Sequence, residues 1–161
     1  MIFEFGKYIL DVDVEKTRDF YNRVEKITDG CDCAGCRNYE KWAISTDNKI
    51  KHVFYQMGAQ IEKATEVYVN WVNKDESVFY GGFYHLCGKI LQGCQVWDEI
   101  NEKHCVLNED VFLELGDNYR VAFTEDILLI EENFPMPVIQ IEILANIPWV
   151  LSEECDYYRC Q

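Results

Sequence analysis

The sequence predicts an α+β domain in which an N-terminal strand and two to three short helices pack on a mostly antiparallel β-sheet. Three observations support this fold class. Apolar residues recur at helical spacing between residues 14 and 60, they alternate with a period of two from residue 65 onwards, and a hairpin signal separates two of the later segments. Helical segments followed by a run of strands are typical of the α+β class.

The length and composition of the chain favour one folded domain. Its 161 residues match the size of a single ordinary domain, and hydrophobic residues make up 48 % of them, which is enough to build a core. We therefore predict a single α+β domain over residues 1–152, which includes a cysteine turn at residues 31–36. Residues 153–161 are expected to form a polar C-terminal tail.

The first predicted elements are a strand and a helix. Residues 2–14 alternate in polarity, which predicts a strand or a bent strand pair, and Gly6 permits a bend within it. Residues 13–27 place apolar side chains at helical spacing, and the carboxylate of Asp13 is suited to cap this helix. Gly30 is expected to end it.

Two shorter helices and a series of strands follow. The spacing of apolar residues predicts helices over residues 37–45 and 48–60. The later segments alternate in polarity or are rich in β-branched and aromatic residues, so we predict them as strands. Gly81 and Gly82 suggest a bulge or a sharp coil in the second of these strands. The predicted strands cover residues 65–73, 78–91, 111–115, 119–123 and 137–144.

The chain is strongly acidic, with 29 Asp and Glu residues against 15 Lys and Arg residues and a net charge of −14. Such a field repels phosphates and anionic lipids, so we expect neither direct nucleic-acid binding nor membrane binding. A basic protein is the kind of partner that this charge would attract. No apolar signal segment follows Met1 and no apolar run is long enough for a membrane helix, so a cytoplasmic location is expected.

Three cysteines lie within six positions of the chain. Cys31, Cys33 and Cys36 have the spacing C-x-C-x-x-C, and Gly35 allows the turn between them to be tight. Two residues between ligands let one turn direct two sulfur atoms at the same ion, and thiolates are preferred zinc ligands. Because nothing in the sequence indicates secretion, metal binding is favoured over a disulfide framework. We therefore predict a zinc site at this turn.

A closed structural zinc site needs a fourth ligand, which the spacing does not identify. His85 is the preferred candidate and Cys87 is the second, and both lie in the predicted strand that contains two adjacent glycines. If water took this position instead, the metal would stay open for chemistry. The other candidates are Cys94, Cys105, Cys155, Cys160, His52 and His104.

Several segments of the chain resemble a family of small uncharacterised bacterial proteins. They are FEFGKYILDVDVEKTRDFY, CDCAGCRNY, YGGFYHLCG and IPWVL, in this order, and together they span most of the chain. The most specific part is the pattern C-D-C-x-x-C-R-N-Y, from Cys31 to Tyr39. No activity is established for that family. The resemblance therefore implies a coherent domain and a role for the cysteine turn, and it implies no mechanism.

These observations favour a zinc-stabilised, acidic cytoplasmic domain that acts by binding and not as an enzyme. Two alternatives stay open. The acidity is also typical of a nucleic-acid mimic that inhibits a basic nucleic-acid-binding protein by occupying its groove. The cysteine turn also fits a thiol- or metal-dependent enzyme, because Arg37 follows it directly and a cation lowers the pKa of nearby thiols. We prefer the interpretation that Arg37 offsets thiolate charge or pairs with an acidic residue.

Overall fold

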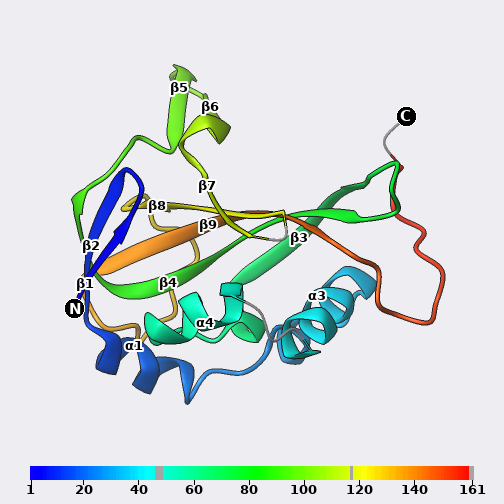
Figure 1. Ribbon diagram of the computed structural model, residues 1–161, viewed down its shortest axis with the longest axis horizontal. Coiled ribbons are helices and arrows are strands. Elements are labelled where there is room, and N and C mark those ends of the chain that lie inside the picture. Colours follow the sequence, from blue (N-terminus) through cyan, green and yellow to red (C-terminus); the bar gives the residue numbers. More distant parts are fainter. Residues whose placement is uncertain (46–48, 117, 160–161) are drawn as a thin grey trace.

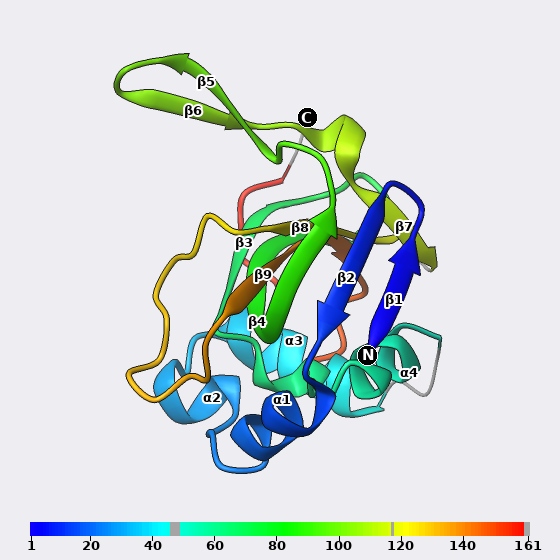
Figure 2. The same cartoon turned by 90° about the vertical axis from the view of Figure 1, so that its left-hand side faces the viewer.

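A computed structural model describes residues 1–45, 49–116 and 118–159 of the chain. Within these residues it confirms the α+β class, because four α-helices accompany a seven-stranded sheet whose strand pairs are antiparallel (Figure 1). The helices lie together on one face of this sheet (Figures 1 and 2). None of the helices in the described residues has the length and apolar character that crossing a membrane requires.

Among the described residues, every helical element except one short 3₁₀ helix precedes residue 66, where the third strand begins. The α-helices are α1 (Val14–Tyr21), α2 (Ile27–Gly30), α3 (Ala34–Ser45) and α4 (Lys49–Gln56), and the 3₁₀ helices are η1 (Ile61–Lys63) and η2 (Glu109–Val111). Helix α1 begins where the sequence predicts, because the Asp13 carboxylate accepts a hydrogen bond from the backbone N–H of Lys16 at 3.1 Å. It ends earlier than expected, at Tyr21, and the separate helix α2 follows.

The main sheet has the strand order β1-β2-β4-β9-β8-β7, and β3 pairs with β4 as well. Strand β4 organises it: one edge pairs with β9, and the other pairs first with β3 and then with β2. The strands are β1 (Ile2–Phe5), β2 (Tyr8–Val12), β3 (Glu66–Val72), β4 (Val78–Gln92), β5 (Trp97–Asn101), β6 (His104–Leu107), β7 (Leu113–Gly116), β8 (Tyr119–Thr124) and β9 (Val138–Ile147).

Glycines shape two of the predicted strand segments. The N-terminal segment is a bent strand pair, and Gly6 lies in its turn with a φ of 55°, as the sequence suggests. The bulge expected at Gly81 and Gly82 lies instead in the partner strand, where the register shifts between Val69 and Trp71. The glycines serve close approach, because a Cβ on Gly82 would meet the carbonyl oxygen of Glu66 at 2.4 Å.

The core lies between the helices and the main sheet, and aromatic side chains fill its centre. Tyr39 of α3, Phe54 of α4, Tyr84 of β4 and Tyr119 of β8 are all fully buried. The Phe54 ring packs edge-on against Tyr84 at a centroid distance of 4.7 Å. The Tyr39 hydroxyl lies 2.6 Å from that of Tyr84 and 2.7 Å from that of Tyr119. These contacts fix the position of α3, the helix that follows the cysteine turn.

Strands β5 and β6 form a two-stranded ribbon that is separate from the main sheet. It projects from the molecule on the side opposite the helices (Figure 1). The sequence does not predict this ribbon, because its residues are largely exposed and show no buried face with a period of two.

Candidate metal centre

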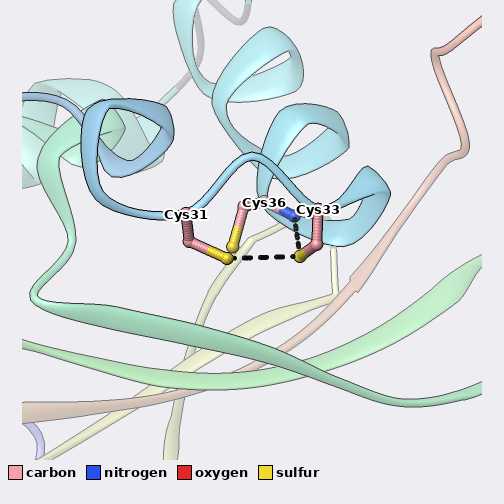
Figure 3. A group of neighbouring side chains, drawn as sticks. All are labelled: Cys31, Cys33 and Cys36. Atoms are coloured by element: carbon pink, nitrogen blue, oxygen red, sulfur yellow. Dashed lines mark hydrogen bonds between the residues drawn. The ribbon is translucent and has the colours of Figure 1, made fainter.

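The three cysteines of the turn lie together at the start of helix α3 (Figure 3). The Sγ atoms of Cys31, Cys33 and Cys36 all lie within 4.8 Å of one another, and those of Cys31 and Cys33 are 3.5 Å apart. Cys31 and Cys33 are exposed, whereas Cys36 is buried. The side chains point toward one another from two sides of the turn (Figure 3). The group is therefore close enough to hold a metal ion.

Local structure explains why the turn gathers these sulfur atoms. Helix α2 ends at Gly30 and the chain leaves it in an extended conformation at Cys31. Cys33 directly precedes α3, and its Sγ accepts a hydrogen bond from the backbone N–H of Cys36 at 3.5 Å. This is the bond that a serine side chain makes at a helix N-cap. Cys33 thus caps the helix while Cys36, one turn on, lies on its buried side.

Gly35 allows other parts of the chain to approach the turn. A Cβ at this position would meet a methyl group of Val69 at 2.8 Å and the Tyr157 hydroxyl at 2.9 Å. Two hydrogen bonds also hold the backbone of Gly35. The Tyr80 hydroxyl donates to the Gly35 carbonyl oxygen at 2.8 Å, and the Gly35 N–H donates to Tyr157 Oη at 2.9 Å. The turn is therefore packed against both the sheet and the C-terminal segment.

The three thiols differ in acidity. Burial raises the pKa of Cys33, but hydrogen bonds from the backbone and thiol of Cys36, and from Cys31 and Tyr157, outweigh it and lower that pKa to about 7. Burial, followed by the hydrogen bonds to Cys31 and Cys33, raises the pKa of Cys36 well above its ordinary value. The turn thus holds one exposed, acidic thiol beside a buried one that keeps its proton.

Arg37 pairs with acidic residues, in agreement with the preferred sequence interpretation. Its guanidinium contacts the carboxylates of Asp32 and Glu153. The hydrogen bond to Glu153 raises the pKa of Arg37, so the group stays charged. Since Glu153 belongs to the C-terminal segment, this ion pair joins the end of the chain to the cysteine turn.

The segment from residue 153 to residue 159, which the sequence presents only as a polar tail, packs against the body of the protein. The Tyr157 hydroxyl oxygen accepts the hydrogen bond from the N–H of Gly35. The ring of Tyr157 lies edge-on to Trp149 at a centroid distance of 6.2 Å. The N–H of Val72 in β3 donates to the Tyr158 carbonyl oxygen at 2.7 Å. The segment therefore runs from the cysteine turn to the edge of β3.

The structure does not bring His85 to the three thiols. Successive side chains of a strand point to opposite faces, and Tyr84 points toward α3, so His85 points to the other face of the sheet. Its ring nitrogens lie 3.3 Å from Thr65 Oγ1 and 3.2 Å from Gln140 Oε1. Burial lowers the pKa of His85. The residue is a buried, hydrogen-bonded part of the sheet and lies outside the three-cysteine group.

The other candidates for a fourth ligand are dispersed, with one exception. Cys87 is buried beside α1, where its backbone N–H donates a hydrogen bond to Thr17 Oγ1, and Cys105 is exposed on the β5–β6 ribbon. Cys155 is half-buried and lies in the sequence between Glu153, which contacts Arg37, and Tyr157, which contacts Gly35. Its sulfur is not part of the group whose atoms lie within 4.8 Å of one another. Cys160 lies outside the described residues. The remaining candidates are Cys94 beside the core, His52 on α4 and His104 on β6.

The comparisons with known proteins return nothing: no protein-family model, no curated protein and no solved structure matches this chain. The resemblance seen in the sequence therefore stays an expectation. A function can be inferred from the geometry of the turn.

Proposed function

We propose that Cys31, Cys33 and Cys36 bind Zn²⁺ as thiolates and that the domain acts by binding, with the ion as a structural part of it. The observation that carries this proposal is the mutual approach of the three sulfur atoms to within 4.8 Å. Zinc–sulfur bonds of about 2.3 Å in a tetrahedron place sulfur atoms about 3.8 Å apart. The Cys31 and Cys33 sulfur atoms, 3.5 Å apart, are already close to this spacing, so small side-chain adjustments would give zinc geometry.

The kind of donor favours zinc over other common ions. Thiolates are soft ligands that select zinc, copper(I) or iron–sulfur clusters, whereas Ca²⁺ and Mg²⁺ require oxygen ligands. The spacing C-x-C-x-x-C also differs from the usual iron–sulfur patterns. A reducing compartment such as the cytoplasm would keep all three sulfurs available, because thiols there are not oxidised to disulfides.

Cys155 is the best placed of the candidate ligands to complete the site. It belongs to the segment whose Glu153 contacts Arg37 and whose Tyr157 contacts Gly35, so both flanks of Cys155 are held at the turn. With Cys155 as the fourth ligand the ion would fasten the C-terminal segment to the start of α3. A closed site of this kind stabilises a fold and leaves no position for a substrate.

Metal analysis of the purified protein tests the proposal. Protein prepared without added metal should contain about one equivalent of zinc. Replacing Cys33 by Ser should remove most of it, and the matched control Cys105→Ser, which alters an exposed thiol on the ribbon, should retain it. Less than half an equivalent of any transition metal in the unaltered protein, together with unchanged stability in a chelator, would contradict the proposal.

Thiol–disulfide exchange is a second candidate function, and the arrangement of Cys33 and Cys36 favours it. An exposed cysteine precedes a helix and a buried one follows three residues later, joined by the bond from the Cys36 N–H to Cys33 Sγ. In this reaction the Cys33 thiolate would attack glutathione disulfide and release one glutathione. Cys36 would then displace the second glutathione and leave a Cys33–Cys36 disulfide.

Metal loading separates the two functions. The exchange reaction requires free thiols, so bound zinc should block it. Mass spectrometry after incubation with glutathione disulfide should show a Cys33–Cys36 disulfide in protein treated with a chelator and none in zinc-loaded protein. If the protein as purified contains no metal and undergoes exchange rapidly, the second function replaces the first.

A further inference from the structure

A groove lies on the side of the molecule away from the helices, between the β5–β6 ribbon and the loop that follows β8. The ribbon projects from the top of the molecule in Figure 2, and the loop runs down its left side. The groove has a volume of about 520 Å³. Its lining consists of Gln95, Trp97, Glu99 and Cys105 from the ribbon and its approach, and of Asp126 and Leu128 from the loop.

The loop beside the groove exposes three aliphatic residues in succession. Leu128, Leu129 and Ile130 are 50 %, 68 % and 42 % exposed. Leu129 also has a φ of 46°, which an aliphatic residue rarely adopts. Strand β9 holds this conformation in place, because the backbone N–H of Leu128 donates to Oε1 of Gln140 in that strand at 2.7 Å. The sheet thus fixes the loop in a form that presents apolar side chains to solvent.

A buried carboxylate lies beneath the groove. The side-chain amide of Gln140 donates to Glu142 Oε1 at 2.6 Å, and Glu142 also interacts with the side chain of Trp97. Glu142 is only 4 % exposed. These contacts join the base of the ribbon to the sheet, so the aromatic wall of the groove has a fixed position.

Charge around the groove is almost entirely negative. The ribbon and the adjoining part of the loop, residues 95–107 and 125–130, contain five acidic residues and one lysine. Two of the acids, Glu99 and Asp126, line the groove from opposite sides. Aliphatic residues with a negative rim are complementary to a segment that carries both aliphatic and cationic side chains.

We infer that this groove is a docking site for a basic, aliphatic-rich segment of a partner protein. Lysine or arginine side chains of that segment would pair with Glu99 and Asp126, and its aliphatic side chains would pack on Leu128 and Leu129. The inference is independent of the metal site, since none of these residues contacts the cysteine turn. The inference also differs from mimicry of a nucleic acid. A mimic would reproduce only the charges of a phosphate backbone, whereas this groove also offers aliphatic contacts.

The charge excludes the other occupants. A second copy of the chain would bring the same acids into contact, since a symmetric dimer presents one patch to itself. Nucleic acids and anionic membranes carry the same sign of charge as the groove. A basic protein segment is the occupant for which both the charge and the aliphatic surface are favourable.

Fluorescence anisotropy with short labelled peptides tests the inference at about 0.15 M ionic strength, where weak surface charge effects are screened. A peptide that alternates Lys and Leu should bind. Peptides that alternate Lys with Ser, or Glu with Leu, should bind at least about tenfold more weakly, because each lacks one of the two complementary features. Equal binding of the Lys/Leu and Lys/Ser peptides would overturn the inference, since it would show attraction by charge alone.

Two pairs of substitutions locate the binding. Changing Glu99 and Asp126 together to Gln and Asn, or Leu128 and Leu129 together to Ser, should each weaken binding of the Lys/Leu peptide about tenfold or more. The matched control changes the exposed residues Glu4 and Glu25 to Gln, which removes the same charge elsewhere, and should alter affinity less than about twofold. Equal losses in the groove and control variants would overturn the inference.

Sedimentation of the protein alone tests the competing occupant. The unaltered protein should be monomeric. A dimer that dissociates when Leu128 and Leu129 are both changed to Ser would overturn the inference, because a second copy would then be the occupant. All the altered side chains are exposed, so the variants should keep the circular dichroism spectrum of the parent protein.

Discussion

At Cys33 the sulfur accepts the N–H of Cys36 in the place where a serine hydroxyl caps a helix. The same hydrogen bonds that cap the helix also stabilise the thiolate, which lowers the pKa of Cys33 from 9.0 to about 7 despite its partial burial. A metal ligand must lose its proton before it binds, so a preformed thiolate favours capture of an ion at neutral pH.

This acidity predicts a pH-dependent reaction. In metal-free protein the thiolate of Cys33 forms as the pH rises through about 7, so its alkylation by iodoacetamide should reach half its maximal rate near that pH. Peptide mapping by mass spectrometry follows the site. Cys36 should react only at much higher pH, because burial raises its pKa. A midpoint for Cys33 near the ordinary value of a thiol would contradict the assigned hydrogen bonds.

The tyrosine hydroxyls of the core form a directed chain. Tyr84 donates to the carbonyl oxygen of Ile61 at 2.6 Å, so Tyr39 donates to Tyr84 and Tyr119 donates to Tyr39. Burial raises the pKa of all three phenols, so they stay protonated and the chain is intact at ordinary pH.

The position of each hydroxyl in the chain predicts unequal costs of removal. Tyr39→Phe leaves the buried Tyr119 hydroxyl without an acceptor, so it should lower the free energy of unfolding by about 1–3 kcal/mol. Tyr119→Phe removes only the terminal donor and should cost about 0.5–1.5 kcal/mol. Denaturant unfolding of the two variants measures the difference. Equal losses, or a larger loss for Tyr119→Phe, would show that the chain runs otherwise.

At the scale of elements, the approach of Val69 and Tyr157 to α3 depends on Gly35. Gly35→Ala should lower the free energy of unfolding by about 1–3 kcal/mol through overpacking, although alanine is the better helix former. Gly30→Ala is the matched control, because a Cβ there meets nothing within 4 Å, and it should change stability by less than about 1 kcal/mol in either direction. Thermal unfolding compares the two. A neutral Gly35→Ala would contradict the close packing at the turn.

The elements that the sequence predicts are those with a strong local signal. Helices α1, α3 and α4 and the strands of the main sheet all overlap predicted segments, because each has a periodic buried face or a cap. The bounds differ most at α3, which begins at Ala34 and not at residue 37, and at β9, which ends at Ile147 and not at residue 144. Helix α2 has only four residues and the β5–β6 ribbon buries little of its surface, so neither has such a face. The proposed docking groove lies beside this ribbon. No sequence motif marks the groove, because it is formed by the position of the ribbon in the fold.

The cysteine cluster is predictable because it is local, whereas its surroundings are not. The spacing of Cys31, Cys33 and Cys36 confines three sulfurs to one turn whatever the rest of the fold does. The location of His85 depends on which face of β4 meets the helices, and this is decided by tertiary packing. The contact of Tyr157 with the turn joins residues more than a hundred positions apart, so no local pattern reports it.

At the scale of the whole molecule, the proposed ion would couple the chain's end to its body. The C-terminal segment is held by the Arg37–Glu153 ion pair and the Gly35–Tyr157 hydrogen bond, both at the turn. Exposed ion pairs contribute little on their own. A metal that also bound Cys155 would add free energy that depends on its concentration, about 2.7 kcal/mol at a hundred times its dissociation constant.

Limited proteolysis tests this coupling. A Glu-specific protease should cleave after Glu153 and Glu154 at least about fivefold faster once a chelator removes zinc, because the segment then opens more often. Cleavage after Glu99 and Glu102, which are exposed on the β5–β6 ribbon, is the internal control and should keep its rate. Identical cleavage of the C-terminal segment with and without zinc would show that the ion does not hold it.

X-ray absorption spectroscopy at the zinc edge counts the sulfur atoms around the ion, so it shows directly whether the thiols of the turn are its ligands. We expect three or four sulfur ligands at about 2.3 Å, with one fewer in the Cys33→Ser variant if that variant retains zinc. A shell made only of oxygen or nitrogen atoms at about 2.0–2.1 Å would contradict this expectation, because the three thiols of the turn would then not be the ligands.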